Sequence, residues 1–192
     1  MLAEAENASP DVWKNIFDSE YPDGESYRAG RQMLDGTGET TPELAAWVRE
    51  TVAKFDQQGL VVNSFAYVRV RGQNVQWPHR DLRRSRMSEN EKVYSTFLAV
   101  NVDTPPPYSG YFVLNSTTGL PDPWVEVPLL KTRGDMTVIP STCIHAGGAN
   151  PPVEGGPRWR YVAFAGLGTH RQNYDATCPV MTPPPGATGS GG

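Results

Sequence analysis

The stretch WPHRD, residues 77–81, places a histidine and an aspartate two positions apart. Residues two apart on a β-strand point to the same side, so both side chains can bind one metal ion from the end of one strand. A second stretch, GDMTVIP at residues 134–140, predicts a strand and a turn, and His145 follows it. Two imidazoles and one carboxylate hold non-haem Fe(II) with three coordination positions open. We therefore predict a metal site made by His79, Asp81 and His145.

The length and composition predict one loop-rich β domain. The chain has 192 residues, of which 38% are hydrophobic and 20% charged, with 19 glycines and 18 prolines. A chain of this length can bury a single sizeable core, and so many glycines and prolines favour short strands over a helical bundle. We find no internal repeat and expect one domain over residues 1–181. Residues 182–192 are rich in Pro, Gly and Ser and predict a disordered tail.

Two helices are expected before the strands. Ser9-Pro10-Asp11 has the residue types of a helix start, and four apolar side chains follow at helical spacing: Val12, Trp13, Ile16 and Phe17. The second helix opens at Thr40 with a capping box to Glu43 and ends at Gly59. Its apolar stripe predicts packing against a sheet and consists of Leu44, Trp47, Val48, Val52 and Phe55.

From Leu60 onward the pattern changes to strands. The alternation between residues 62 and 70 is typical of a half-buried strand, and the remaining strand candidates are 93–102, 111–114, 124–130, 136–139 and 159–167. Many short strands with long loops, preceded by helices, predict a mainly β fold with supporting helices (α+β). We expect a double-stranded β-helix, or jelly-roll barrel, with helices on one face.

Charge and cysteine content limit the function classes. Two cysteines are too few for a disulfide framework, and the first twenty residues lack an apolar signal segment. No apolar run is long enough to cross a membrane. These features predict an intracellular protein, nuclear or cytoplasmic, with no membrane partner. The formal net charge of −4 argues against a protein that coats nucleic acid through its overall charge.

The sequence around the His79–Asp81 pair is locally basic. Seven cationic residues lie in it, namely Arg69, Arg71, Arg80, Arg83, Arg84, Arg86 and Lys92. One interpretation is a solvated loop whose arginines pair with acids elsewhere. The other is a positive rim that attracts an anionic substrate to the metal pocket, with Arg83, Arg84 and Arg86 gripping a nucleic-acid backbone.

Four stretches resemble the Fe(II)/2-oxoglutarate oxygenase superfamily, and within it the group of ten-eleven-translocation and J-binding proteins. They are residues 65–81 ending in WPHRD, 96–113 (TFLAVNVDTPPPYSGYFV), 134–145 (GDMTVIPSTCIH) and 160–166 (RYVAFAG). In the second, SG replaces the usual GG. The superfamily motifs are more specific than those of the subgroup, and together the stretches cover about half of the chain.

The resemblance implies a role for each matching residue. His79, Asp81 and His145 correspond to the iron ligands, and Arg160 to the residue that binds the far carboxylate of the cosubstrate 2-oxoglutarate. A guanidinium suits this role because its fork donates two hydrogen bonds to a carboxylate. Arg158 competes for it, since residues two apart on a strand share a face. Tyr67 and Arg69, on the strand before the metal motif, are further candidates to face the cosubstrate.

Three functions remain open from the sequence. The first is oxidation by Fe(II), 2-oxoglutarate and O2 of the methyl group of a 5-methylpyrimidine in DNA, with the base flipped into the pocket. The second is hydroxylation of a protein side chain, such as proline, or of a small metabolite by the same machinery. The third is a non-enzymatic jelly-roll binding module. The retained Asp81 favours hydroxylation, because the halogenating branch of the superfamily has a small residue there.

Overall fold

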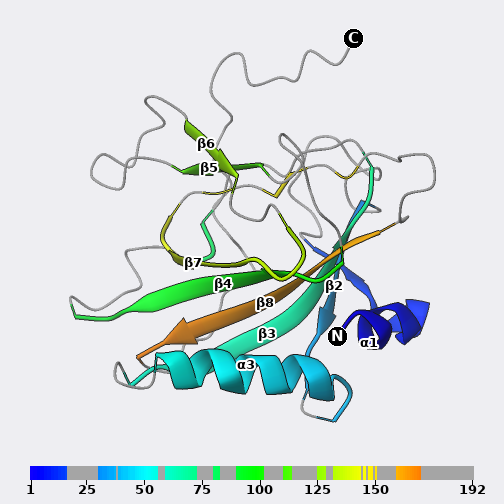
Figure 1. Ribbon diagram of the computed structural model, residues 1–192, viewed down its shortest axis with the longest axis horizontal. Helices are drawn as coiled ribbons and strands as arrows, with labels where there is room; N and C mark the ends of the chain where they lie inside the picture. The colour runs from blue at the N-terminus through cyan, green and yellow to red at the C-terminus, as the bar shows by residue number, and fades with distance from the viewer. Residues whose placement is uncertain are drawn as a thin grey trace.

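A six-stranded antiparallel β-sheet is the main element of the fold, seen in a computed structural model (Figure 1). The structure describes residues 1–16, 30–37, 39–55, 59–72, 80–82, 90–101, 110–113, 125–128, 132–143, 145, 147–148, 150 and 159–169. In 110–113 and 125–128 only the backbone is described. No helix in these ranges is long and apolar enough to cross a membrane.

The strand order across the large sheet is β1-β2-β3-β8-β4-β7. The strands are β1 Lys14–Asn15, β2 Arg31–Asp35, β3 Val61–Val70, β4 Val93–Ala99, β7 Met136–Pro140 and β8 Arg160–Gly168. A separate two-stranded ribbon pairs β5 Gly110–Val113 with β6 Val125–Pro128 and lies on the side away from helix α3 (Figure 1). All six predicted strands are confirmed, with ends that differ by at most three residues; β1 and β2 were not predicted.

The two faces of the sheet carry different side chains. Directly paired residues share a face, and the faces alternate along each strand. Tyr67 pairs with Ala163, which pairs with Leu98, so these three lie on one face. The neighbouring row, Ala66, Phe164 and Phe97, lies on the other. Two separate environments therefore flank the sheet.

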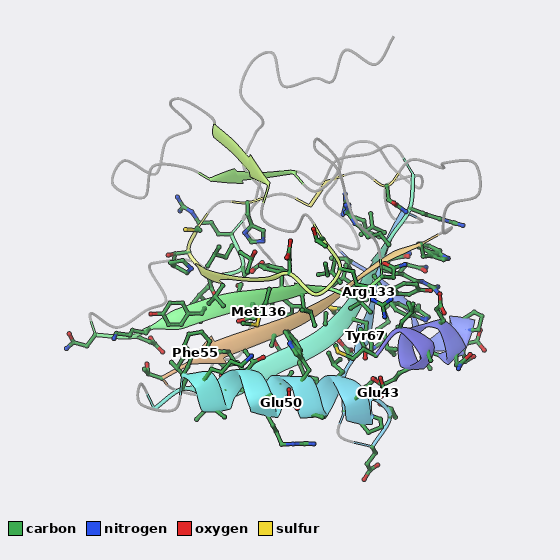
Figure 2. All side chains as sticks on the ribbon, viewed as in Figure 1. Glu43, Glu50, Phe55, Tyr67, Arg133 and Met136 are labelled. Carbon is green, nitrogen blue, oxygen red and sulfur yellow. The ribbon has the colours of Figure 1, made fainter. Side chains whose placement is uncertain are left out.

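Helix α3, Pro42–Lys54, covers the face that carries Tyr67 (Figures 1 and 2). Its predicted apolar stripe packs there: Leu44 joins the cluster of Tyr67 and Ala163, and Val48 the cluster of Ala165 and Leu167. The second predicted helix is thus confirmed. Thr41 is the N-cap and makes no capping bond through its side chain. The predicted capping box between Thr40 and Glu43 is corrected accordingly.

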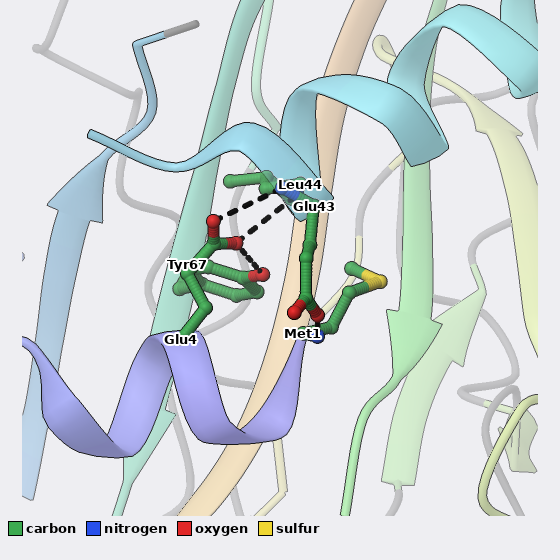
Figure 3. A network of polar contacts seen from close by, with 5 residues as sticks. All are labelled: Met1, Glu4, Glu43, Leu44 and Tyr67. Atoms are coloured by element: carbon green, nitrogen blue, oxygen red, sulfur yellow. Dashed lines mark hydrogen bonds and ion pairs between the residues drawn. The ribbon is translucent and has the colours of Figure 1, made fainter. Parts of the chain in front are cut away.

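The first backbone groups of α3 are capped by another helix. The carboxylate of Glu4, on α1 (Leu2–Asn7), accepts hydrogen bonds from the backbone N–H groups of Glu43 and Leu44, both at 3.0 Å. The same carboxylate accepts a hydrogen bond from the hydroxyl of Tyr67 (Figure 3). A negative charge at a helix N-terminus is favourable, because the unpaired N–H groups carry partial positive charge. Glu4 therefore ties α1, α3 and β3 together.

The predicted helix after Ser9 is wrong. Pro10–Val12 form one 3-10 turn (η1), and Lys14–Asn15 then pair with β2 as strand β1. The turn is short because Trp13 is buried against Tyr161, with ring centroids 6.0 Å apart, and this contact sets the chain on the edge of the sheet. Tertiary packing outweighs the local helix signals here. Phe17 lies outside the described residues.

Closure of the predicted barrel is not seen among the described residues, whose two sheets share no strand. The antiparallel, mainly β character of the fold is confirmed. The predicted tail, residues 182–192, lies outside the described ranges.

Candidate metal and cosubstrate site

Two of the three predicted metal ligands lie side by side. His145 Nε2 is 3.6 Å from Asp81 Oδ1, and the two side chains are 3% and 14% exposed. This separation is too long for a hydrogen bond. Two donors about 2.1 Å from one metal ion lie about 3.0–3.4 Å apart at bond angles of about 90–110°. A shift of a few tenths of an ångström would therefore let both atoms bind the same ion.

The other ring nitrogen of His145 is committed to the backbone. Nδ1 lies 3.2 Å from the carbonyl oxygen of Cys143, and a carbonyl can only accept, so Nδ1 donates. In the neutral ring, Nε2 then presents its lone pair toward the carboxylate of Asp81. Metal-binding histidines commonly have this arrangement, in which one N–H donates to a carbonyl and the other nitrogen binds the ion. An edge-on contact with Phe97, at 5.5 Å between ring centroids, also holds the ring.

Strand β7 sets the position of this segment. Gly134 has φ +93°, a conformation that favours glycine, in the turn that leads into β7. β7 pairs with β4, and at its end the N–H of Ser141 donates to the carbonyl of Val93. The N–H of Leu82 donates to the carbonyl of Ser141, which brings Asp81 to the same end of the strand. The backbone therefore joins two segments that are distant in sequence.

The carboxylate of Asp81 is also held by a side chain. The hydroxyl of Ser95, on β4, donates a hydrogen bond to Asp81 Oδ2, and Ser95 Oγ lies 2.9 Å from Ser141 Oγ. Both serines are fully buried. Among these contacts, Oδ2 is bonded to a hydroxyl while Oδ1 faces the imidazole.

Two buried arginines lie on the same face of the sheet as His145. Arg160 pairs with Val70, which pairs with Arg31, so the three form a row. Arg160 donates to the carbonyl of Gly148 at 2.6 Å, and Arg31 donates to the carbonyls of Gly147 and Gly148 at 2.8 Å each. These glycines follow His145 by two and three residues. The guanidinium groups therefore lie next to the segment that carries the predicted ligand.

Tyr67 and Arg69 occupy the opposite face. The hydroxyl of Tyr67 bonds to Glu4, and its pKa is raised, first by burial and then by the nearby Glu4 carboxylate. The guanidinium of Arg69 stacks between the rings of Trp13 and Trp159, at 4.1 and 4.4 Å from their centroids. Both side chains support the packing between the sheet and the N-terminal segment. We therefore leave them out of the proposed site.

Several predicted site residues lie outside the described ranges: His79, Arg83, Arg84, Arg86 and Arg158. Within those ranges, no group of three or more His, Cys, Asp or Glu residues could hold a metal ion. The structure brings together Asp81 and His145, and places Arg160 on their face of the sheet. The donors present, an imidazole nitrogen and a carboxylate oxygen, fit the predicted ion.

Sequence reasoning missed Ser95, Ser141 and Arg31. Ser95 alternates with Val93 and Phe97 along a strand that was predicted, so its face could have been inferred, but its partner could not. Arg31 could not be predicted from the sequence, because strands are recognised by apolar and β-branched residues and arginine is usually exposed. Burial raises the pKa of the Cys143 thiol, and the charge of Arg80 partly offsets this.

No protein-family model matches the sequence, and neither does any curated protein. Solved structures are similar in fold. HygX from Streptomyces hygroscopicus, with nickel and 2-oxoglutarate bound, has a TM-score of 0.57 and 13% identity over 87% of this chain and 76% of HygX. EvdMO1 has a TM-score of 0.52 and 19% identity over 83% of this chain. SnoN, a non-haem α-ketoglutarate-dependent epimerase from nogalamycin biosynthesis, has a TM-score of 0.51 and 17% identity over 74% of this chain.

The chain spans 39% of EvdMO1 and 64% of SnoN. At identities below one fifth, these similarities establish a shared fold. That fold is similar to the predicted double-stranded β-helix.

Proposed function

We propose that the chain is an Fe(II)- and 2-oxoglutarate-dependent oxygenase. One observation carries the proposal: Nε2 of a buried histidine and a carboxylate oxygen face each other at 3.6 Å, with the histidine's Nδ1 donating to a carbonyl. Two electron-pair donors in this arrangement are stabilised by a shared cation. The fold shared with HygX and SnoN supports Fe(II) as that cation and 2-oxoglutarate as its cosubstrate.

In this proposal Asp81 and His145 hold the ion together with His79. One imidazole, one carboxylate and a second imidazole on one side of the ion leave the other side open. The carbonyl of Cys143 orients His145, and the hydroxyl of Ser95 orients Asp81. Each ligand thereby has a partner that limits its rotation, so less entropy is lost when the ion binds.

Arg160 binds the distal carboxylate of the cosubstrate. Its side chain is only 7% exposed, and a buried guanidinium binds a carboxylate more strongly than an exposed one. Its bond to Gly148 holds the guanidinium beside the segment that follows His145, and the guanidinium fork can donate two hydrogen bonds to one carboxylate. Arg158, two residues earlier, is the alternative anchor.

When bound, Fe(II) and 2-oxoglutarate supply the oxidising chemistry: O2 is consumed, 2-oxoglutarate becomes succinate and CO2, and a C–H bond of the substrate is oxidised. The residues of the chain bind, orient and exclude water. Phe97, Val162 and Phe164 provide an apolar surface on the face of His145. We propose hydroxylation as the outcome, because Asp81 retains its carboxylate as a ligand.

Two substrate classes are proposed. A methyl group of a 5-methylpyrimidine in DNA is supported by the resemblance of the sequence motifs and by the run of Arg83, Arg84 and Arg86. A small metabolite is supported by the solved structures, because HygX has been seen with hygromycin B bound and SnoN belongs to nogalamycin biosynthesis. A protein side chain is a further alternative.

The test loads the protein with Fe(II) and 2-oxoglutarate without oxygen, then admits O2. One sample contains methylated DNA and a second contains cell extract; succinate and oxidised products are measured by mass spectrometry. Oxidised 5-methylcytosine or thymine supports the DNA substrate. Succinate release with extract and an unchanged DNA digest moves the proposal to a protein side chain or a small metabolite. If no sample yields Fe(II)-dependent succinate, the result contradicts the oxygenase proposal and favours a non-enzymatic binding module.

For the DNA substrate, replacing Arg83, Arg84 and Arg86 with Ala gives a second measurement. Each lost phosphate contact should flatten the slope of log K against log salt by about 0.9. Decarboxylation of 2-oxoglutarate without substrate should not change. An unaltered salt slope rules out a role for these arginines in DNA binding.

A further inference from the structure

The two oxygens of the Asp81 carboxylate have different surroundings. Oδ1 faces His145 Nε2 at 3.6 Å. Oδ2 accepts a hydrogen bond from the hydroxyl of Ser95. A serine hydroxyl has one proton, so Ser95 must accept in its contact with Ser141, and Ser141 donates across the 2.9 Å between the hydroxyl oxygens. Two buried hydroxyls therefore form a directed chain that ends on one carboxylate oxygen.

This chain of hydroxyls is fixed by backbone contacts at both ends. Ser95 lies within strand β4, opposite Ile139 of β7. Ser141 follows β7 directly; its N–H donates to Val93, and its carbonyl accepts from Leu82, the residue after Asp81. The serines therefore hold Oδ2 from the sheet, while the backbone holds the segment that carries Asp81. Rotation of the carboxylate about its Cβ–Cγ bond would break the bond to Ser95.

The rotation matters because a carboxylate can bind a metal ion through one oxygen or through both. A triad that binds through one oxygen leaves three of six positions open. A cosubstrate that chelates through two oxygen atoms takes two of them and leaves one for O2. If Asp81 bound through both oxygens, one position would be lost, and chelation and O2 binding would compete.

We propose that Ser95, supported by Ser141, is a positioning residue that reserves Oδ2 and keeps Asp81 a one-oxygen ligand. This inference rests on the proposed function. Removing the Ser95 hydroxyl removes the bond that fixes Oδ2, while the positive charge of a bound ion attracts both carboxylate oxygens. The carboxylate would then be able to turn and bind the ion through both oxygens, which would occupy a position that 2-oxoglutarate needs.

Thr96 provides a matched control. It follows Ser95 on the same strand, is also fully buried, and points to the opposite face, toward α3. Its hydroxyl makes no hydrogen bond with any of the described residues. Thr96→Val removes a buried hydroxyl from β4 and keeps the side-chain shape, so it reports what such a loss does to the strand alone.

The experiment uses Co(II) as the probe, because its visible absorption changes with the ligands around the ion and their geometry. Parent, Ser95→Ala, Ser141→Ala and Thr96→Val are titrated with Co(II), and then with 2-oxoglutarate under air. The expected result for Ser95→Ala is Co(II) binding close to that of the parent, a visible spectrum that differs from that of the parent, and an affinity for 2-oxoglutarate about ten-fold lower. Ser141→Ala changes both readouts in the same direction by less, and Thr96→Val matches the parent.

Parent-like spectra and 2-oxoglutarate affinity in Ser95→Ala overturn the inference, as does an equal change in Thr96→Val. If Ser95→Ala does not fold, as judged by circular dichroism, Ser141→Ala decides in the same way. Asp81→Ala separates the two levels of the argument. If it binds Co(II) like the parent, the proposed metal site itself is wrong; if it loses Co(II) while Ser95→Ala stays parent-like, only the role of Ser95 is wrong.

Discussion

Arg31 and Arg160 donate to the same acceptor, the carbonyl oxygen of Gly148, at 2.8 and 2.6 Å. They come from opposite ends of the sequence and meet because β2 and β8 both pair with β3. Arg31 donates to Gly147 as well, so it binds the segment after His145 at two points. Arg31 therefore holds this segment, whereas cosubstrate binding is the role that we propose for Arg160.

Arg160→Ala should raise the KM for 2-oxoglutarate strongly. A buried carboxylate then loses a charge-assisted pair worth at least about 2 kcal/mol, which corresponds to about thirty-fold. Fe(II) affinity should change much less. Arg158→Ala is the control, measured in the same succinate assay. A loss in Arg158→Ala with a silent Arg160→Ala would show that the other guanidinium is the anchor.

Arg31→Met should lower the free energy of unfolding and have little effect on the affinity for 2-oxoglutarate. The variant keeps an unbranched side chain but removes two charge-assisted bonds to backbone carbonyls, and each such bond contributes about 1.5–3 kcal/mol. Urea denaturation followed by tryptophan fluorescence measures the loss. Arg49→Met, on the exposed side of α3, should stay within about 0.5 kcal/mol of the parent. Equal stability of the two variants would contradict the role given to Arg31.

Glu4→Ala should destabilise the protein by about 1–2 kcal/mol, since α3 loses the cap on two of its N–H groups. Glu6→Ala is the matched control, because Glu6 is exposed on the same helix. Chemical denaturation gives both values. If the two substitutions lower the stability equally, the contacts of Glu4 drawn in Figure 3 do not stabilise the fold.

The raised pKa of Tyr67 predicts that the free energy of unfolding falls at alkaline pH. Burial, and then Glu4, raise the pKa of the folded hydroxyl above that of an unfolded tyrosine. The folded state therefore keeps a proton that the unfolded state releases above about pH 10, and the free energy of unfolding falls as pH rises through that range. Tyr67→Phe should show a shallower fall between pH 9 and about 11. A slope equal to that of the parent would exclude this linkage.

Most helices and strands could be predicted from the sequence, whereas the long-range contacts between them could not. Alternation of apolar residues and turn residues located β3 and the five later strands, and the apolar stripe located α3. Strands β1 and β2 were missed because their residues show no alternation. Long-range pairing defines them instead, since β2 pairs with β3 and β1 pairs with β2. The helix expected after Pro10 failed because the burial of Trp13 determines that segment.

The candidate site, too, could be predicted only in part: its ligands could, and the residues that hold them could not. Residue types and spacing identified Asp81 and His145, which the structure brings together. Strand phase could also have excluded Tyr67 and Arg69, because they lie one position out of register with Ala66, Val68 and Val70, the residues on the face of His145. The hydroxyls that hold Asp81 and the second arginine depend on tertiary contacts that no local pattern encodes.

The central claim is that His79, Asp81 and His145 bind one Fe(II), and anaerobic titration with Fe(II) tests it most directly. The parent should bind one equivalent. His79→Ala, Asp81→Ala and His145→Ala should each weaken binding beyond the roughly 10–100-fold that loss of an orienting partner costs. The third histidine of the chain supplies the control, and His170→Ala should bind like the parent. Parent-like Fe(II) binding by His145→Ala would contradict the claim.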